Sequence, residues 1–414
     1  MSAPPRIAGP AAPVRSRADL LGVLRDPGAE PTRLVDLLLG ALVLLAWIPP
    51  RMPSGVSVGL IAGAALVVLG LSRRPAFTLS GPQSRLGWLV PAMSLVLVYA
   101  VAVSIASPDT SLNGWPRRLS RLLLVLLLFV VLAQGRIHYP SLVRGMGLGL
   151  VANAVLFEVG LAPRPYGDYL SGFLLDKNVA GLVCAVVGLL LAGLARTPPR
   201  AALVLGVTVV LLWLTGSRTS LAALGCGIAW LWLRPRLGVL GRIVLVAALA
   251  FVVEFVEANY ARIGVFAGRF GSDQLRERID DASYEKVRET PWTGSGLGEA
   301  YVRVDGDTFF FHNSYWAAFV EGGWVLVVAY AAVTLLVGVG LLRAGRTTRP
   351  WAAAEAANLA VLVCALRLGE VFGTTVAMTA LAAGVLGLLA TRTGADGPPV
   401  PEEAPPPVAS TLTR

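Results

Sequence analysis

The chain has 414 residues, of which 55% are hydrophobic and only 14% carry a charged side chain. Average soluble domains carry about 25% charged residues, so the composition excludes an ordinary soluble enzyme and indicates a polytopic membrane protein. The formal net charge is +10, supplied almost entirely by arginine. Because these arginines lie between apolar segments, the positive-inside rule explains them better than nucleic-acid binding does.

Both ends of the chain are predicted to be disordered cytoplasmic tails. Residues 1–31 are rich in Pro, Ala and Arg and have no apolar core of their own, so we expect no cleavable signal peptide. Residues 392–414 are rich in Pro and lack apolar periodicity.

About twelve apolar segments are long enough to span, or nearly span, a bilayer. Their expected boundaries are 34–48, 55–71, 86–106, 119–133, 141–161, 178–195, 201–215, 219–233, 239–258, 313–342, 351–368 and 371–390. We therefore expect an all-α polytopic membrane protein, with nine transmembrane helices within 32–258 and three within 313–391. The tenth segment is long enough to tilt or to extend beyond the membrane.

Short loops rich in arginine alternate along the chain with loops that contain acidic residues. The arginine clusters without Asp or Glu are Arg73, Arg74 and Arg85; Arg136 and Arg144; Arg196 and Arg200; Arg234, Arg236 and Arg242; Arg343, Arg346 and Arg349. Such clusters mark the cytoplasmic side. An even number of spans then places both termini in the cytoplasm.

The one long connection, 259–312, is consequently predicted to be an extracytoplasmic loop. In a chain whose other loops are short, a loop of this length is usually functional. It is polar, with helical character around 272–289, and its sequence TGSGLG at 293–298 predicts a turn.

Three basic residues on the outer side are the strongest candidates for a functional site. Arg218 lies in the tight turn TGSR between two spans, Arg276 lies in the long loop, and His312 follows three phenylalanines. Charge is expensive in a membrane, roughly 2.5 to 3.5 kcal/mol per group at the bilayer centre. A guanidinium fork suits phosphate, and an imidazole can take a proton from a sugar hydroxyl. These residues therefore suggest a site for an anionic, phosphate-bearing substrate.

Each of these residues also has a structural alternative. Arg218 could anchor a helix end by snorkelling. Arg276 and the nearby Arg278 could belong to a solvated, salt-bridged helix face, and His312 could pack at the interface among aromatic rings. Further basic candidates with the same alternative are Lys286 and Arg288.

The outer start of the sixth span carries Asp176, Lys177 and Asn178. Asp176 is expected to cap the helix and Lys177 to lie at the interface, whereas Asn178 lies just inside the apolar run, where an amide needs a partner. Arg367 and Glu370 are three residues apart near another outer boundary, and this spacing predicts a structural ion pair.

Cys184, Cys226 and Cys364 all fall inside apolar runs, which predicts buried free thiols without a disulfide or a metal site. The sequence contains no phosphate-binding loop, zinc-type histidine cluster or glycosidase-type carboxylate pair. We therefore expect neither a metal ion nor a cofactor.

Four stretches, taken in order, resemble the O-antigen ligase/polymerase family of bacterial envelope proteins: SGFLLDKNVAG (171–181), LLWLTGSRTSLAAL (211–224), RERIDDASYEKVRETPWTGSGLG (276–298) and HNSYWAAFVEGGW (312–324). The resemblance covers roughly 140–390. Arg276 matches an arginine that precedes a Pro-x-x-Gly-x-Gly turn beginning at Pro291. Family members often have Trp four residues after that arginine; Asp280 stands there instead, which leaves Arg276 and Arg278 both open.

The resemblance implies a multi-pass glycosyltransferase of the bacterial cytoplasmic (inner) membrane with an extracytoplasmic active site. The family transfers a glycan from a polyprenyl-pyrophosphate donor to a lipid, glycan or protein acceptor, in what looks like a metal-independent, inverting reaction. The implied catalytic residues are His312, Arg218 and Arg276. The substrate-binding residues that we expect are Arg278, Arg288, Lys177, Asn178, Asn313 and Glu321.

Ligase and polymerase share these motifs, so the resemblance leaves both activities open, as it does the identities of glycan and acceptor. An alternative of another class is a transporter or flippase for a lipid-linked anion, which needs charged groups distributed through the depth of the bundle. A non-catalytic scaffold is a third possibility. No nucleic-acid partner is expected.

Overall fold

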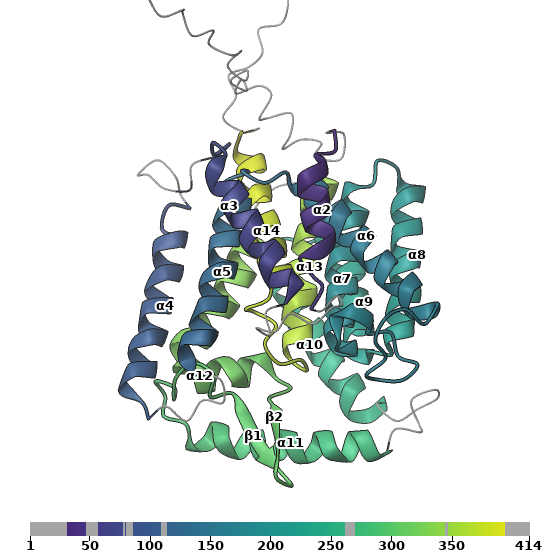
Figure 1. The fold of residues 1–414 in the computed structure, drawn as a ribbon. Coiled ribbons are helices and arrows are strands. Elements are labelled where there is room, and N and C mark those ends of the chain that lie inside the picture. The colour runs from purple at the N-terminus through teal and green to yellow at the C-terminus, as the bar shows by residue number, and fades with distance from the viewer. Residues whose placement is uncertain are drawn as a thin grey trace, which may run out of the picture.

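The computed structural model describes residues 31–46, 57–77, 79, 86–108, 114–260, 270–343 and 347–393. Most of both predicted tails, together with Arg85 and Arg346, lies outside the described residues. The described residues form thirteen α-helices and one two-stranded hairpin, which confirms the all-α fold class (Figure 1).

Every predicted apolar segment coincides with a helix. These helices are α2 (Leu34–Leu42), α3 (Val58–Ser72), α4 (Leu89–Ala106), α5 (Trp115–Ala133), α6 (Tyr139–Glu158), α7 (Lys177–Leu194), α8 (Pro198–Thr215), α9 (Arg218–Leu233), α10 (Val239–Tyr260), α12 (Ser314–Val333), α13 (Arg349–Ala365) and α14 (Thr375–Thr393). Among the described residues, five helices are long and apolar enough to cross a membrane: α4, α6, α7, α8 and the stretch Ser314–Gly338. This indicates an integral membrane protein, whereas the count of twelve transmembrane helices stays a prediction.

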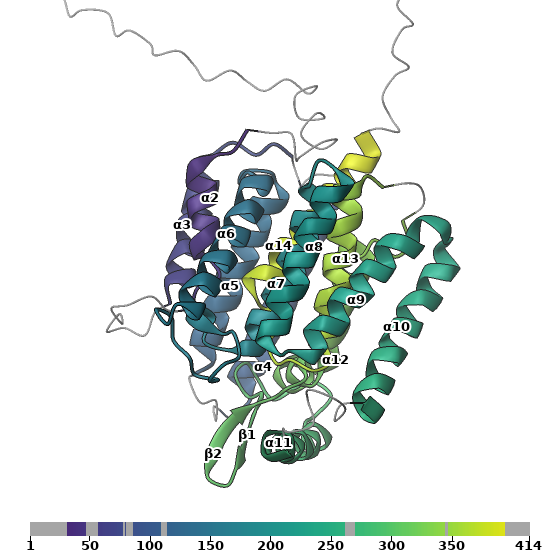
Figure 2. The same ribbon diagram turned by 90° about the vertical axis from the view of Figure 1, so that its right-hand side faces the viewer.

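The remaining helix, α11 (Phe270–Glu289), lies across one end of the bundle, as Figures 1 and 2 show. It confirms the helical character expected within the long loop. The start of α2 and the end of α14 lie at the opposite end of the bundle (Figure 1). Both described ends of the chain are therefore on the face away from α11.

A short hairpin that the sequence analysis missed lies beside α11. It consists of β1 (Tyr301–Val304) and β2 (Asp307–Phe310), paired antiparallel with Val304 opposite Asp307. Asp305 and Gly306 connect the strands with positive φ angles of 54° and 88°. Asp-Gly is the preferred sequence for this two-residue turn. Residues of α11, the hairpin and the start of α12 share one small apolar cluster: Ile279, Ala300, Val302, Phe311, Ala317 and Val320.

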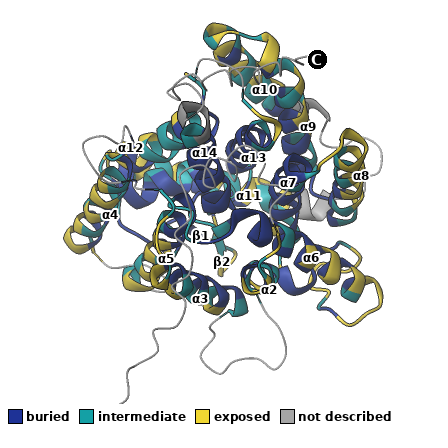
Figure 3. Cartoon of the chain, turned by 90° about the horizontal axis from the view of Figure 1, so that it is seen from above, coloured by how far each residue is buried: buried dark blue, intermediate teal, exposed yellow. Residues whose placement is uncertain are grey.

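The centre of the bundle is formed by α7, α13 and α14, as the view from above shows (Figure 3). Every residue of 353–365 in α13 is buried, whereas α4 exposes Leu95 and Ile105 to 69% and 68%. The three cysteines are buried free thiols, as predicted. In a bilayer, lipid tails are as apolar as leucine, so close packing holds such helices together more than the hydrophobic effect does.

Close packing depends on glycine where α2 crosses α6. A Cβ atom added at Gly145 would overlap the carbonyl group of Leu37, and one added at Gly149 would overlap that of Ala41. The two glycines are spaced as in a G-x-x-x-G pattern, which lets two backbones approach closely in a membrane.

Several arginines of the predicted cytoplasmic clusters also form buried ion pairs. The fully buried Asp36 lies 2.8 Å from Arg73, and Glu355, which is 1% exposed, lies 2.9 Å from Arg234 and also contacts Arg343. These arginines therefore join separate helices in addition to any role in setting the orientation.

The tenth apolar segment differs from the long continuous helix that its sequence suggests. α12 is broken at Gly322 and Gly323, with φ 61° and ψ −159° at Gly323, and a π-helical stretch (Thr334–Gly338) follows it. The glycine-rich turn packs into the break: the Ser295 N–H donates to the Val320 carbonyl (2.7 Å), and the Trp324 N–H donates to that of Trp292 (3.2 Å). Interrupted backbone is tolerated at membrane depth only where protein satisfies its polar groups, and the turn does so here.

Candidate functional site

A polar cavity of about 660 Å³ lies at the end of the bundle that α11 and the hairpin cover. Five of the predicted catalytic and substrate-binding residues line it together: Lys177, Asn178, Arg218, Arg276 and His312. They come from α7, α9, α11 and the segment between β2 and α12. The fold therefore gathers residues that are far apart in the sequence around one space.

The cavity has a strong excess of positive charge. Its lining includes the cationic side chains Arg121, Lys177, Arg218, Arg276 and Arg367, and the carboxylates Asp176 and Glu370. In the described part of the chain, no group of three or more His, Cys, Asp or Glu residues is placed to hold a metal ion. An anionic ligand in this cavity would meet guanidinium and ammonium groups.

Arg218 is placed by the tight turn between α8 and α9. Gly216 ends α8 in the left-handed conformation, with φ 61°, and Ser217 caps α9 by accepting from the Ser220 N–H at 3.4 Å. Arg218 is then the first helical residue and is half-buried. A helix N-terminus favours anions, so its partial positive charge adds to that of the guanidinium.

The start of α7 forms the neighbouring wall. Asp176 caps the helix, as predicted, by accepting from the backbone N–H groups of Asn178 (2.7 Å) and Val179 (2.9 Å). Tyr166 donates a hydrogen bond to the same carboxylate at 2.9 Å. Burial and the nearby Asp176 raise the pKa of Tyr166 to about 12, so the phenol stays protonated at neutral pH. The Lys177 ammonium lies over the Tyr166 ring, 5.6 Å from its centre.

Arg276 and His312 meet at a shared carboxylate. The Arg276 side chain donates to the Arg367 carbonyl at 2.7 Å, and its Nε lies 3.9 Å from Asp280 Oδ2. His312 Nδ1 lies 3.2 Å from Asp280 Oδ1. Positions 276 and 280 are one helical turn apart and so project from the same face of α11.

The other three basic candidates on α11 do not line the cavity. Lys286 lies 3.5 Å from the Glu299 carboxylate. Arg278 pairs with Asp305 of the hairpin turn at 2.5 Å, and Arg288 lies 3.4 Å from Glu285 on the exposed side of α11. Because residues two apart on a helix point in different directions, only one of Arg276 and Arg278 can face the cavity. The fold places Arg276 there.

Asn313 and Glu321 also lie away from the cavity. The Asn313 side-chain oxygen caps α12 by accepting from the Tyr315 and Trp316 N–H groups at 2.9 and 3.1 Å. Glu321 is buried, lies 3.1 Å from Arg118, and accepts from the Gly298 N–H at 3.0 Å. Glu321 therefore fastens the glycine-rich turn to α5 and α12.

The predicted ion pair between Arg367 and Glu370 is wrong. Arg367 pairs with Glu254 of α10 at 2.6 Å, whereas Glu370 lies 3.1 Å from Arg118 and 3.8 Å from Arg121. The physical reason is that α13 ends at Ala365, so the helical spacing that would bring the two side chains together does not apply. Glu370 has a positive φ of 55°, which is unusual for a residue with a side chain and recurs at functional sites.

Arg121, Arg367 and Glu370 line the cavity but were not predicted as site residues from the sequence. A signal for Arg121 was present, because Arg117, Arg118 and Arg121 begin an apolar helix on the face opposite the other arginine clusters. That placement contradicts the positive-inside bias in the same way as Arg218 does. No comparable local pattern marks Glu370.

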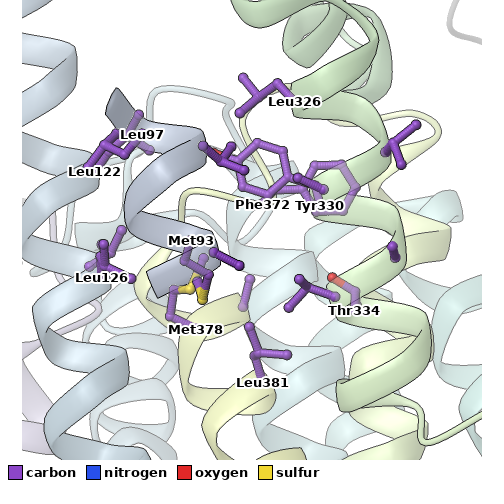
Figure 4. A pocket seen from close by; sticks show the side chains of 18 of the residues that line it. Met93, Leu97, Leu122, Leu126, Leu326, Tyr330, Thr334, Phe372, Met378 and Leu381 are labelled. Atoms are coloured by element: carbon purple, nitrogen blue, oxygen red, sulfur yellow. The ribbon is translucent and has the colours of Figure 1, made fainter. Parts of the chain in front are cut away.

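Two apolar cavities lie near the polar one. A crevice of about 190 Å³ shares Arg121, Val179 and Glu370 with the polar cavity and continues between α3, α5, α7, the residues just after α2 and the start of α14. A larger apolar cavity of about 370 Å³ lies between α4, α5, α12 and α14, with Met93, Leu122, Phe372 and Met378 among its lining side chains (Figure 4). The crevice is thus continuous with the polar site. The larger cavity has no charged residue in its lining, and most of its lining side chains are apolar.

Residues 201–331 match the family described as O-antigen ligase. The match includes Arg218, Arg276 and His312, and it confirms the family resemblance over this stretch. The family comprises bacterial envelope enzymes of ligase/polymerase type that act on lipid-linked glycans. No curated protein matches the chain closely enough to count as a relative.

Proposed function

We propose that this protein, which carries an O-antigen ligase domain over residues 201–331, is a membrane glycosyltransferase of the ligase type. It transfers a glycan from a polyprenyl-pyrophosphate donor to an acceptor hydroxyl outside the cytoplasmic membrane. The observation that supports this most strongly is that one cavity unites Arg218, Arg276 and His312 beside an apolar crevice. A polymerase reaction would use the same donor site with another lipid-linked glycan as the acceptor.

In the proposed reaction, the acceptor oxygen attacks the anomeric carbon on the face opposite the pyrophosphate. The new carbon–oxygen bond forms as the bond to the phosphate oxygen breaks, which inverts the configuration. Arg218 and Arg276 stabilise the negative charge that develops on the leaving pyrophosphate, an effect worth about 3 to 4 kcal/mol per donor in other enzymes. His312 takes the proton of the acceptor hydroxyl and later releases it to water.

The transfer assay tests this proposal. Purified protein in nanodiscs is supplied with a polyprenyl-pyrophosphate glycan and candidate acceptors, the products are resolved by mass, and NMR gives the anomeric configuration of the new linkage. A new glycosidic bond with inverted configuration is expected. A protein that moves the lipid across a vesicle membrane and forms no such bond would be a transporter. The transporter reading is disfavoured because the cationic lining gathers at one end of the bundle.

The apolar crevice beside Arg121 is where we place the prenyl chain of the donor. Gly63 of α3 lines this crevice and has only ordinary contacts, with Leu124 at 3.7 Å from an added Cβ. Gly63→Phe should therefore fill the crevice and raise the donor KM roughly tenfold or more, since each 1.4 kcal/mol of lost affinity is a factor of ten. Ala92→Phe fills the larger apolar cavity instead and should leave the donor KM unchanged. If Ala92→Phe raised the donor KM and Gly63→Phe did not, the prenyl chain would bind in the larger cavity.

The orientation of the site is open to a direct test. Glu289 at the end of α11 and Arg200 at the start of α8 are both exposed, and they lie at opposite ends of the bundle. A cysteine at position 289 should react with a membrane-impermeant thiol reagent in intact cells. A cysteine at position 200 should react only after permeabilisation. The native cysteines are buried and give a low background. The opposite labelling would place the cavity in the cytoplasm and contradict the proposed function.

A further inference from the structure

Asp280 lies outside the residues that line the polar cavity, yet it contacts two that do. Its Oδ1 lies 3.2 Å from His312 Nδ1 and its Oδ2 lies 3.9 Å from Arg276 Nε. The His312 and Asp280 side chains are 33% and 28% exposed, so solvent reaches the pair only partly. Thirty-two residues separate the two in the sequence, so the contact comes from the docking of α11 and not from chain proximity.

Both sides of this contact are held by independent packing. On the His312 side, the preceding Phe311 is 2% exposed, and the following Asn313 caps α12. On the other side, Ile279 packs α11 into the same apolar cluster as Phe311. The geometry between the imidazole and the carboxylate is therefore set before any substrate binds.

We propose that Asp280 is a positioning residue for His312 in the reaction proposed above, on which this inference rests. An ionised carboxylate can only accept hydrogen bonds, so Nδ1 of the neutral imidazole must carry the proton and donate it to Asp280. Nε2 is then the unprotonated nitrogen. When Nε2 takes the acceptor hydroxyl proton, the carboxylate stabilises the imidazolium that forms, as in other acid–base dyads.

Arg276 has a second role in this arrangement. Its guanidinium faces the other oxygen of Asp280 and also donates to the Arg367 carbonyl, so it restrains the carboxylate. The Asp280 carboxylate thus lies between Arg276, which binds the leaving pyrophosphate in the proposed reaction, and His312, which removes the proton of the acceptor hydroxyl. The other acidic residues near Asp280 on α11, Glu277 and Asp281, are both exposed.

Kinetic measurements on matched variants test the role. Asp280→Asn keeps the shape of the side chain and removes its charge, and should lower kcat by about 10- to 100-fold with little change in donor KM. Asp280→Glu should recover part of kcat. Asp281→Asn makes the same charge change one residue away on the exposed face and should leave both parameters unchanged. Equal loss in both Asn variants, or an unchanged kcat in Asp280→Asn, would overturn the assignment.

A spectroscopic readout separates this inference from the proposed function. The chain contains two histidines, so ¹⁵N-histidine spectra show two rings, and His312→Gln assigns them. The neutral His312 ring should be the Nδ1–H tautomer in the wild type and should lose that preference in Asp280→Asn. An Nε2–H tautomer in the wild type would overturn the inference even if transfer occurs. A fixed Nδ1–H tautomer in a protein that transfers no glycan would support the pairing and overturn the function.

Discussion

Replacing His312 with alanine should reduce glycan transfer by at least about a hundredfold, since general base catalysis contributes typically 10²- to 10⁴-fold. Binding of the lipid-linked donor should persist, because the arginines and the apolar crevice remain in place. Single-turnover rates and donor binding, measured on the same purified protein, separate the two effects.

The second histidine offers the matched control. His138 lies in the segment between α5 and α6, is buried, and its Nδ1 lies 2.7 Å from the Ser141 hydroxyl oxygen. His138→Asn retains a partner for that hydroxyl and should leave transfer unchanged. Ordinary transfer by His312→Ala would remove His312 as the base. Glu370, a carboxylate that lines the cavity, would then become the next candidate.

Arg218→Lys should lose most of the transfer activity although the charge is retained, because an ammonium group cannot offer the planar fork that binds two phosphate oxygens. A loss of about 10²-fold or more is expected if Arg218 stabilises the leaving group. Expression and membrane insertion should remain near normal, since residue 218 is only half-buried.

Arg288→Lys provides the comparison for this variant. Arg288 is exposed, lies beside Glu285 and does not line the cavity, so its replacement should leave kcat and donor KM unchanged. Full activity of Arg218→Lys would instead favour the explanation in which the arginine only anchors a helix end. The measurement is kcat/KM for the donor at fixed acceptor concentration.

The positions of the helices could be predicted because the length of an apolar run almost determines whether it forms a long helix. Each of the twelve segments coincides with one helix, as α7 (Lys177–Leu194) illustrates against the expected 178–195. The break in α12 could not be predicted in this way. Glycine pairs are common in membrane helices, and the turn that enters the break begins about 30 residues earlier in the chain.

The candidate site was partly visible because charge beside apolar helices is costly, and this argument found Arg218, Arg276 and His312. Contacts that join distant segments could not be predicted in this way. The ion pairs of Glu370 with α5 and of Arg367 with α10 depend on tertiary packing that local spacing does not encode. Asp280 was noted only as a departure from the family pattern, and its contact with His312 required the docking of α11.

The break in α12 also decides how this protein can be divided for engineering. By hydropathy, the membrane part resumes at residue 313, but Ala317 and Val320 pack with α11 and the hairpin in one apolar cluster. The first two turns of α12 therefore pack with α11 and the hairpin, which cover the cavity. The boundary between this unit and the rest of α12 is the helix break at Gly322 and Gly323. A chimaera that exchanges residues 270–321 as one module would preserve the apolar cluster that holds His312 in place. A junction at residue 313 would instead divide that cluster.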